Sequence, residues 1–150
     1  MSTSKHIQTV LNGTIQSLKS VIPISMDIKP PSLMVQPFEQ KEMGVLIGII
    51  GDIKGRIIID STAESFSAIG ATMFGMPLEG EMLESFTGEL GNMIAGNICT
   101  SVASNGVQVD ITPPTVIVGS TRLFGFQHAF KLPVVIENIG AMTIILTIDE

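Results

Sequence analysis

The sequence contains one cysteine, Cys99, and neither tryptophan nor tyrosine. A single cysteine cannot form an intramolecular disulfide, and it cannot build a zinc site from thiolates. The lack of a disulfide framework is typical of the reducing cytoplasm, and we expect the protein there. Without tryptophan and tyrosine, the aromatic side chains are seven phenylalanines, so no stacking platform for bases or sugars is expected.

Charged residues are also scarce. They make up 15% of the 150 residues, against 45% hydrophobic residues, and the net charge is −6. Binding to nucleic acid or to a membrane surface needs a basic face, so neither partner is expected. The first six residues lack the apolar core of a signal peptide, and the longest uncharged run, residues 90–109, is too polar to span a membrane. We therefore expect one domain, residues 1–150, with a large buried core.

Hydrophobic periodicity and turn residues predict a mixture of helices and strands. The predicted helices cover residues 4–22, 62–74 and 79–103. The predicted strands cover residues 24–28, 43–50, 56–60, 107–111, 115–119, 123–126, 132–137 and 142–148. Residues 61–64 (Ser-Thr-Ala-Glu) have the pattern of a capping box, which places Ser61 at the N-cap of the second helix.

Part of the chain repeats at an offset of 83 residues. Residues 24–35 (ISMDIKPPSLMV) match residues 107–118 (VQVDITPPTVIV) at five of twelve positions, including both Pro-Pro pairs. Upstream, Gly13 aligns with Gly96 at the same offset. The alternative is that Pro-Pro followed by a strand recurs by chance, but helix, strand, Pro-Pro and hairpin follow in the same order twice.

The repeat predicts how the chain is organised. Residues 50–60 resemble residues 136–146 after a further shift of three, so the hairpin recurs too. We interpret the chain as one domain of two related halves, about residues 4–60 and 84–149. Because hairpins join the strands in both halves, we expect an α+β fold with a mainly antiparallel sheet and helices on one face.

One polar row stands out on the helix predicted for residues 79–103. On a helical wheel, Ser85, Glu89 and Asn92 share one side at spacings i, i+4 and i+7, opposite an apolar stripe that faces the core. Gly96 lies beside them. This pattern predicts an exposed carboxylate next to an exposed carboxamide. The alternative is that both are ordinary solvated side chains.

The same helix contains Gly88, Gly91 and Gly96. Each glycine costs about 1 kcal/mol relative to alanine in a helix interior. Gly91 lies near the apolar stripe, where close packing of helix on sheet would explain it. Gly96 lies beside Glu89 and Asn92, where either clearance for an approaching molecule or internal packing would explain it.

Residues 85–97 (SFTGELGNMIAGN) resemble the signature helix of the CheC/CheX/FliY chemotaxis phosphatases. That signature has Asp or Ser, three residues, Glu, two residues and Asn, with a proline downstream; Pro113 and Pro114 lie near that place. The single motif and the chain length are most similar to the CheX members. The resemblance implies a CheC-like fold, in which duplicated halves form the sheet and long helices pack on one face.

The resemblance implies a phosphatase that acts on the aspartyl phosphate of a CheY-like response regulator. The regulator supplies the phosphorylated aspartate, a bound Mg²⁺ and a lysine, so no cofactor or metal is expected on this chain. Asn92 would orient the attacking water, a task that suits a carboxamide because it both donates and accepts hydrogen bonds. Glu89 would pair with the regulator's lysine. Ser85 matches the first motif position, with either a direct role or a hydroxyl that supports the helix.

Two further expectations follow from the resemblance and the repeat. CheX-like proteins form homodimers through their sheets, and residues 115–119 or 123–126 are the candidate interface. At the 83-residue offset, Glu89 and Asn92 map onto His6 and Thr9, so the first half lacks the pair. We therefore expect one active site rather than two.

Two other functions stay open. The chain could be a catalytically silent module that keeps the fold and binds a regulator or a flagellar-switch partner. An autonomous hydrolase of small phosphate esters is less favoured, because the sequence has neither a metal cluster nor a phosphate loop. His6 and His128 have no carboxylate at metal-ligand spacing. Cys99 has no nearby histidine or lysine to lower its pKa, so a packing role is expected for it.

Overall fold

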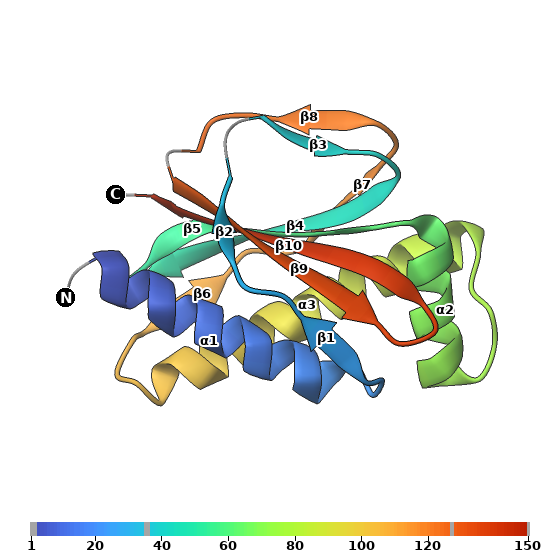
Figure 1. Cartoon of the computed structure of the whole chain (residues 1–150), viewed down its shortest axis with the longest axis horizontal. Coiled ribbons are helices and arrows are strands. Elements are labelled where there is room, and N and C mark those ends of the chain that lie inside the picture. Colours follow the sequence, from blue (N-terminus) through green and yellow to red (C-terminus); the bar gives the residue numbers. More distant parts are fainter. Residues whose placement is uncertain (1–2, 35–36, 127, 150) are drawn as a thin grey trace.

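The computed structural model describes residues 3–34, 37–126 and 128–149. Val35, the last position of the first repeat segment, lies outside these ranges. The elements follow in the order α1 (Thr3–Val21), β1 (Met26–Ile28), β2 (Ser32–Leu33), β3 (Phe38–Gln40), β4 (Met43–Gly51), β5 (Lys54–Ser61), α2 (Ala63–Phe74), α3 (Gly80–Ala103), β6 (Val109–Ile111), β7 (Thr115–Val118), β8 (Thr121–Leu123), β9 (His128–Ile136) and β10 (Gly140–Asp149) (Figure 1).

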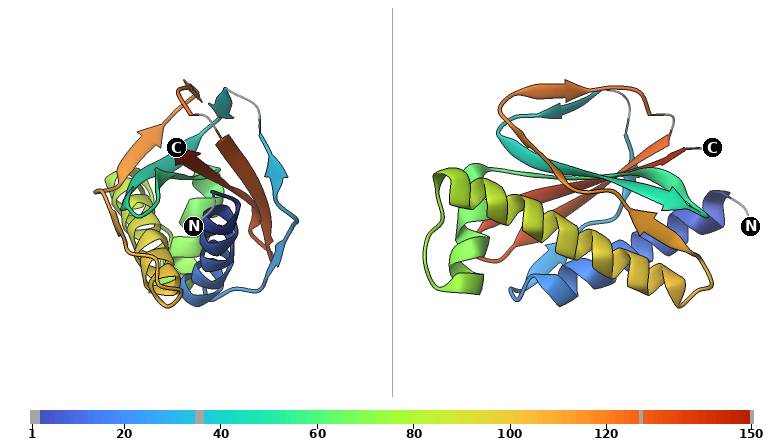
Figure 2. Two further views of the ribbon diagram at one scale, coloured as in Figure 1. Left: turned by 90° about the vertical axis from the view of Figure 1, so that its left-hand side faces the viewer. Right: turned by 180° about the vertical axis from the view of Figure 1, so that it is seen from behind.

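One large antiparallel sheet organises the fold. Its strand order is β1-β9-β10-β5-β4-β6, with β2 also paired to β9 and β7 also paired to β4. Helices α1 and α3 lie side by side on one face, α2 stands at one end, and the short β3–β8 ribbon lies over the other face (Figures 1 and 2). The predicted α+β class with a mainly antiparallel sheet is confirmed.

The strand order is symmetric about the central β10–β5 pair. An offset of 83 residues carries β1 onto β6, β3 onto β8 and the start of β2 onto the start of β7. Each Pro-Pro pair follows an equivalent backbone contact: Lys29 N donates to Pro133 O (2.9 Å), and Thr112 N donates to Gly48 O (3.0 Å). We infer an internal duplication from these correspondences.

The central strand β5 shows why the sheet is so apolar. Ile57, Ile58 and Ile59 are consecutive and all fully buried. Ile57 and Ile59 join the main core between the sheet and the helices. Ile58 points the other way, into a second core that contains Ile145 and Phe126 beneath the β3–β8 ribbon. A strand covered on both faces is apolar along its whole length instead of alternating.

The structure corrects four details of the predicted elements. Thr62, not Ser61, is the N-cap of α2: its hydroxyl accepts from Ser65 N (3.0 Å), while Ser61 belongs to β5 and donates to Ala141 O (2.8 Å). Strand β3 was not predicted, and β8 ends at Leu123 instead of spanning 123–126. Strand β9 begins at His128, four residues before the predicted start at 132.

Helix α1 determines which side of α3 is free. Ser17 Oγ donates to the backbone carbonyl of Ile94 at 2.6 Å. At Gly13, an added Cβ would lie 3.3 Å from Val102, so the two helices approach closely. Because α1 covers one flank of α3 and the sheet covers another, the remaining side of α3 faces outward. In the described ranges, no helix has the length and apolar character needed to cross a membrane.

Asp60, in β5, carries an unfavourable charge. Burial, reinforced by the nearby Glu42 carboxylate and only partly offset by Lys131 and Lys41, raises the pKa of Asp60 from 3.8 to about 6. Within the described residues, its Oδ1 atom is buried without a hydrogen-bond partner. The ionised carboxylate is therefore less stable in the folded chain than in the unfolded chain.

We expect the Asp60→Asn variant to melt at a higher temperature than the parent at pH 7.5. The raised pKa means that the folded chain takes up a proton before the unfolded chain as the pH falls from about 6 towards 4. The parent therefore recovers stability in that window and the advantage of the variant shrinks. Thermal unfolding at pH 7.5 and pH 4.5 measures both values. An equal difference at the two pH values would contradict the assigned pKa.

Candidate functional site

The candidate site lies on α3, the 24-residue helix that runs along one side of the molecule (Figure 2). The burial of the α3 side chains agrees with the faces that the helical wheel predicted. Leu90 and Ile94 are fully buried, whereas Ser85 and Glu89 are exposed and Asn92 is half-buried. The site therefore joins an exposed carboxylate to a half-buried carboxamide.

Two of the three glycines hold α3 close to the sheet. An added Cβ at Gly88 would lie 3.2 Å from Val116 in β7, and one at Gly91 would lie 2.7 Å and 2.9 Å from the two Val45 methyl groups in β4. Gly91 thus has the packing role that its position predicted. At Gly96 an added Cβ would meet no atom within 4 Å, so internal packing does not explain that glycine.

This contrast predicts opposite effects for the same substitution. Gly91→Ala should lower the free energy of unfolding by about 1 kcal/mol or more, because overpacking against Val45 outweighs the gain in helix propensity. Gly96→Ala should raise it by up to about 1 kcal/mol, because the new methyl group enters open space. Urea unfolding of both variants provides the comparison. Stabilisation by both substitutions would show that α3 does not need its close approach to β4.

Glu89 and Asn92 lie one helical turn apart, so both side chains can enter the same small site on a partner. In the described part of the chain, neither side chain forms a hydrogen bond or an ion pair. An unpartnered carboxylate is a strong hydrogen-bond acceptor, and a carboxamide offers both a donor and an acceptor. The pair can therefore bind a cation and orient a polar molecule next to it.

Ser85 and Glu89 also line an open groove of about 720 Å³ between α2 and α3. Its other walls include Phe74, Met76, Met82 and Phe86. We call these six residues the α2–α3 groove. Ser85 Oγ makes no hydrogen bond to any described residue, so its hydroxyl is free to face an occupant. The apolar walls were not predicted as part of the site.

The remaining candidate residues lie elsewhere. His6 and Thr9 are half-buried near the start of α1, away from the α2–α3 end. Cys99 is half-buried, and burial, with a contribution from Asp110, raises the pKa of its thiol. The thiol is therefore protonated at neutral pH and a poor nucleophile. Across the described ranges, no three His, Cys, Asp or Glu side chains are grouped so as to hold a metal ion.

Comparison with known proteins identifies the family. The family model of chemotaxis phosphatase CheX matches residues 43–137, a range that contains Ser85, Glu89, Asn92 and Gly96. The chain belongs to the CheX family. The predicted resemblance to chemotaxis phosphatases, and among them to CheX, is confirmed, as is the expected enzyme class.

Individual CheX proteins are similar over nearly the whole chain. The CheY-P phosphatase CheX of Thermotoga maritima is 30% identical over 135 residues, which cover 87% of each sequence. The crystal structure of chemotaxis protein CheX from Desulfovibrio desulfuricans has a TM-score of 0.80 at 19% identity, covering 95% of this chain and 97% of that one. The CheX–CheY–BeF3–Mg²⁺ complex from Borrelia burgdorferi has a TM-score of 0.79 at 24% identity, covering 96% and 97%.

Proposed function

We propose that this CheX-family chain hydrolyses the aspartyl phosphate of a CheY-like response regulator. The observation that carries the proposal is the pair Glu89 and Asn92, one turn apart on the outward side of α3, whose side chains have no partner among the described residues. The relative from Thermotoga maritima is named for this activity, and the relative from Borrelia burgdorferi was solved bound to CheY.

The main task of the phosphatase in this reaction is to position the attacking water, because none of its own residues forms a bond to the phosphoryl group. Water attacks the phosphorus atom in line with the aspartyl oxygen, that P–O bond breaks, and the products are the regulator's free carboxylate and inorganic phosphate. The Asn92 carboxamide oxygen accepts a hydrogen bond from the water and so aims its lone pair at the phosphorus. Holding water in the attacking position removes an entropic part of the barrier worth several kcal/mol.

Glu89 is the docking residue in this proposal. Its carboxylate pairs with the lysine beside the regulator's phosphorylation site and fixes the depth to which Asn92 enters. A flexible carboxylate at the rim can make this ion pair before the carboxamide is in place. Asn92 contacts the reacting water, so we assign it as catalytic, whereas Glu89 sets the pose.

Ser85 and Gly96 flank the pair on either side along the helix. Gly96 leaves open space beside Asn92, and the proposal assigns that space to the regulator's surface. The same methyl group that should stabilise the fold in Gly96→Ala should therefore slow dephosphorylation. Ser85 shares a groove wall with Glu89, where its free hydroxyl can bond to the regulator.

The duplication predicts one active site. Alanine at His6 or Thr9, the positions that correspond to Glu89 and Asn92, should leave the dephosphorylation rate within about twofold of the parent. Glu89→Ala and Asn92→Ala should each remove most of it. Steady-state phosphate release by the four variants decides this, and comparable losses on both helices would rule out a single site.

The test of the function is whether the chain accelerates phosphate release at all. A CheY-like regulator from the same genome is phosphorylated with a small-molecule phosphodonor in the presence of Mg²⁺, and the decay of the phosphorylated form is followed with and without this chain. Acceleration supports the phosphatase. Binding to the regulator without acceleration would instead identify a silent interaction module.

We also propose that the chain forms a homodimer through its sheet and that it acts in the cytoplasm. Strand β7, within the predicted interface range 115–119, pairs only with β4 among the described strands and exposes Val118. In the other predicted range, Phe124 is exposed but Phe126 is buried in the second core, which favours β7. Light scattering should give twice the mass of one chain, and Val118→Lys should halve it. A monomeric parent would contradict the dimer.

A further inference from the structure

Several large hydrophobic side chains of the α2–α3 groove are exposed to solvent. Phe74, Met76 and Met82 are 60%, 53% and 59% exposed, and together they are three of the eight exposed large hydrophobic side chains in the described ranges. Phe86 forms the floor, with its ring edge-to-face with Phe74 at 5.7 Å. Grouped exposed apolar side chains on one surface mark an interaction site more often than scattered ones do.

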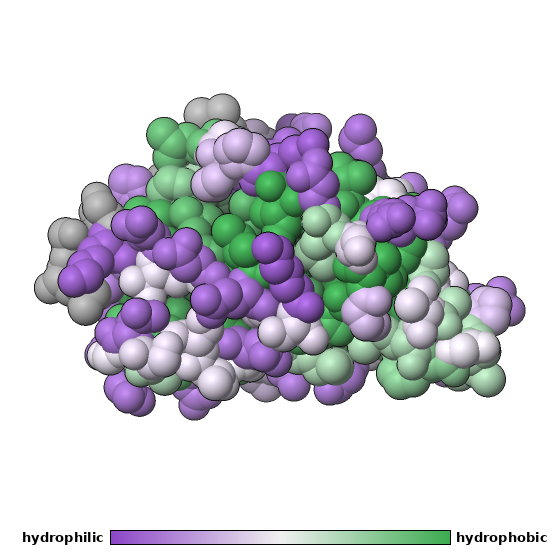
Figure 3. Space-filling view, turned by 60° about the horizontal axis from the view of Figure 1, so that its bottom comes forward, coloured by the Kyte–Doolittle hydropathy of each residue, from purple (hydrophilic) through white to green (hydrophobic). Residues whose placement is uncertain are grey.

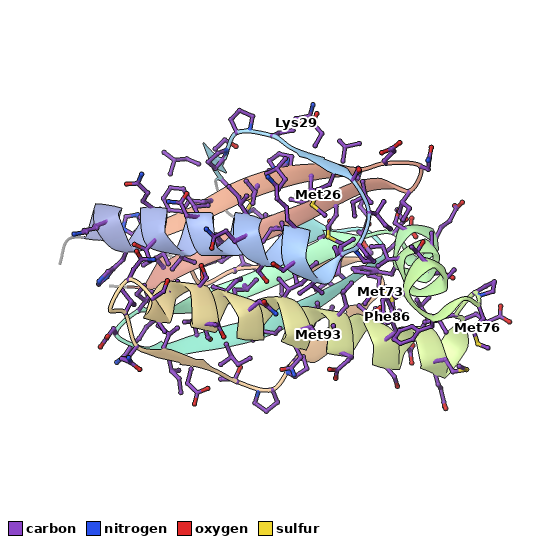
Figure 4. All side chains as sticks on the ribbon, turned by 90° about the horizontal axis from the view of Figure 1, so that it is seen from below. Met26, Lys29, Met73, Met76, Phe86 and Met93 are labelled. Carbon is purple, nitrogen blue, oxygen red and sulfur yellow. The ribbon has the colours of Figure 1, made fainter. Side chains whose placement is uncertain are left out.

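The groove has a defined place in the molecule. Met73 and Phe86 lie between α2 and α3, and Met76 lies on the connecting loop at the end of the molecule (Figure 4). In the space-filling view this end, over α2 and the loop, carries pale green residues among white and light purple ones (Figure 3). Methionine and phenylalanine are enriched at the centres of protein interfaces, and flexible methionines adapt to a partner's shape.

The rim of the groove carries one sign of charge. Residues 57–121 contain no lysine or arginine, although they contain seven acidic residues. Two of those acidic residues, Glu81 and Glu89, line the groove, and Glu79 lies at the N-cap of α3. An apolar floor with an acidic rim fits an apolar side chain flanked by basic residues.

The groove is continuous with the proposed site, because Ser85 and Glu89 belong to both. From Glu89 to Met82 the helix rises by only about 10 Å. A stable protein interface buries about 800 Å² on each partner, far more than two side chains provide. A globular partner placed on Glu89 and Asn92 must therefore also cover a neighbouring surface, and the groove is the apolar surface beside them.

We infer that the α2–α3 groove binds an apolar, basic-flanked segment of the response regulator next to its phosphorylation site. This inference rests on the proposed function and adds the recognition surface to it. A second copy of this chain is a poor occupant, because a twofold contact would place the two acidic rims against each other. The groove holds the regulator but does not touch the reacting atoms, so it should affect KM and leave kcat unchanged.

Substitution of Met82 separates the apolar and electrostatic parts of this recognition. Met82→Lys loses the apolar contact and repels a basic segment, so KM for the phosphorylated regulator should rise at least about tenfold with kcat within twofold. Met82→Glu loses the same contact but keeps the sign of the rim, so its KM should rise less. Leu33→Lys and Leu33→Glu, at a 77% exposed position on β2, are the matched controls and should leave KM unchanged.

Direct binding keeps this test independent of turnover. The Kd of each variant for the BeF3-activated regulator is measured by titration calorimetry, with circular dichroism to verify folding. An unchanged Kd and KM in Met82→Lys would overturn the docking surface while leaving the phosphatase intact. Equal losses in Met82→Lys and Met82→Glu would overturn the charge match. A drop in oligomeric mass in Met82→Lys would assign the groove to a second copy instead.

Discussion

Replacement of Asn92 by alanine is expected to lower kcat for dephosphorylation by about 10²-fold or more, with little change in KM. The reason is that the carboxamide contributes only to the placing of water, and misplacement of about 1 Å already costs about 10²-fold in rate. The Kd for the BeF3-activated regulator should stay close to that of the parent. Rapid-quench measurement of phosphate release at saturating regulator gives kcat directly.

Conservative replacements of Asn92 distinguish positioning from charge. Asn92→Gln keeps the carboxamide but moves it by one methylene, so it should recover part of the lost rate. Asn92→Asp keeps the length but adds a negative charge facing a phosphoryl group, so it should be as impaired as alanine. Full activity in Asn92→Asp would mean that this residue acts as a general base, which is a different mechanism.

Reversal of charge in Glu89→Lys should lower kcat/KM by about 10²-fold or more, mainly through KM. Removal of one partner from a hydrogen-bonded charge pair that is buried in an interface costs about 2–5 kcal/mol, and the lysine adds repulsion against the regulator's own lysine. Since Glu89 is exposed and unpartnered in the described ranges, the substitution should not lower the melting temperature. Steady-state kinetics and thermal unfolding together separate these effects.

Salt provides the control for Glu89. The KM of the parent should rise with ionic strength, because salt screens the attraction between the Glu89 carboxylate and the regulator's lysine as the two proteins approach. In Glu89→Gln that dependence should be shallower. Charge reversal at Glu84, an exposed residue of α3 that does not line the groove, should change KM by less than reversal at Glu89. The same salt dependence in the parent and in Glu89→Gln would contradict the assigned pairing.

Much of the candidate site could be predicted because it depends on helical spacing alone. Glu89 and Asn92 share one face of the helix whatever that helix packs against. The apolar stripe that contains Leu90 and Ile94 faces the core, so the face with Glu89 and Asn92 was predicted to point outward. The role of Gly91 was also predictable, since a glycine on a core-facing stripe implies close packing. For Gly96, spacing left clearance and packing equally open, and only the three-dimensional surroundings exclude packing.

The second core could not be predicted from local patterns. The β3–β8 ribbon that covers it is made of two three-residue strands, too short for an alternating pattern, and its pairing joins residues about 80 apart in the sequence. The predicted strand 132–137 contained Pro133, although proline often interrupts a strand, and the structure extends this strand back to His128. Here the carbonyl of Pro133 bonds outward to Lys29 N, so the missing N–H faces the strand's outer side, not its partner β10.

One residue of the apolar groove, Met82, was recognisable from the sequence. On the same wheel, Met82 lies within about 20° of Glu89 and thus on the polar side of the helix. An apolar residue in a polar row suggests contact with a partner. Phe74 and Met76 gave no comparable signal, because their exposure depends on how the loop between α2 and α3 is placed.

The most direct test of the central claim is the number of phosphate groups released per chain. The phosphorylated regulator is mixed in tenfold excess over this chain, and free phosphate is measured with time. The proposed mechanism predicts that the parent releases many phosphates per chain, well above the regulator's own hydrolysis, and that Asn92→Ala at the same concentration adds nothing to that background. Unchanged turnover in Asn92→Ala, or none in the parent, would contradict it.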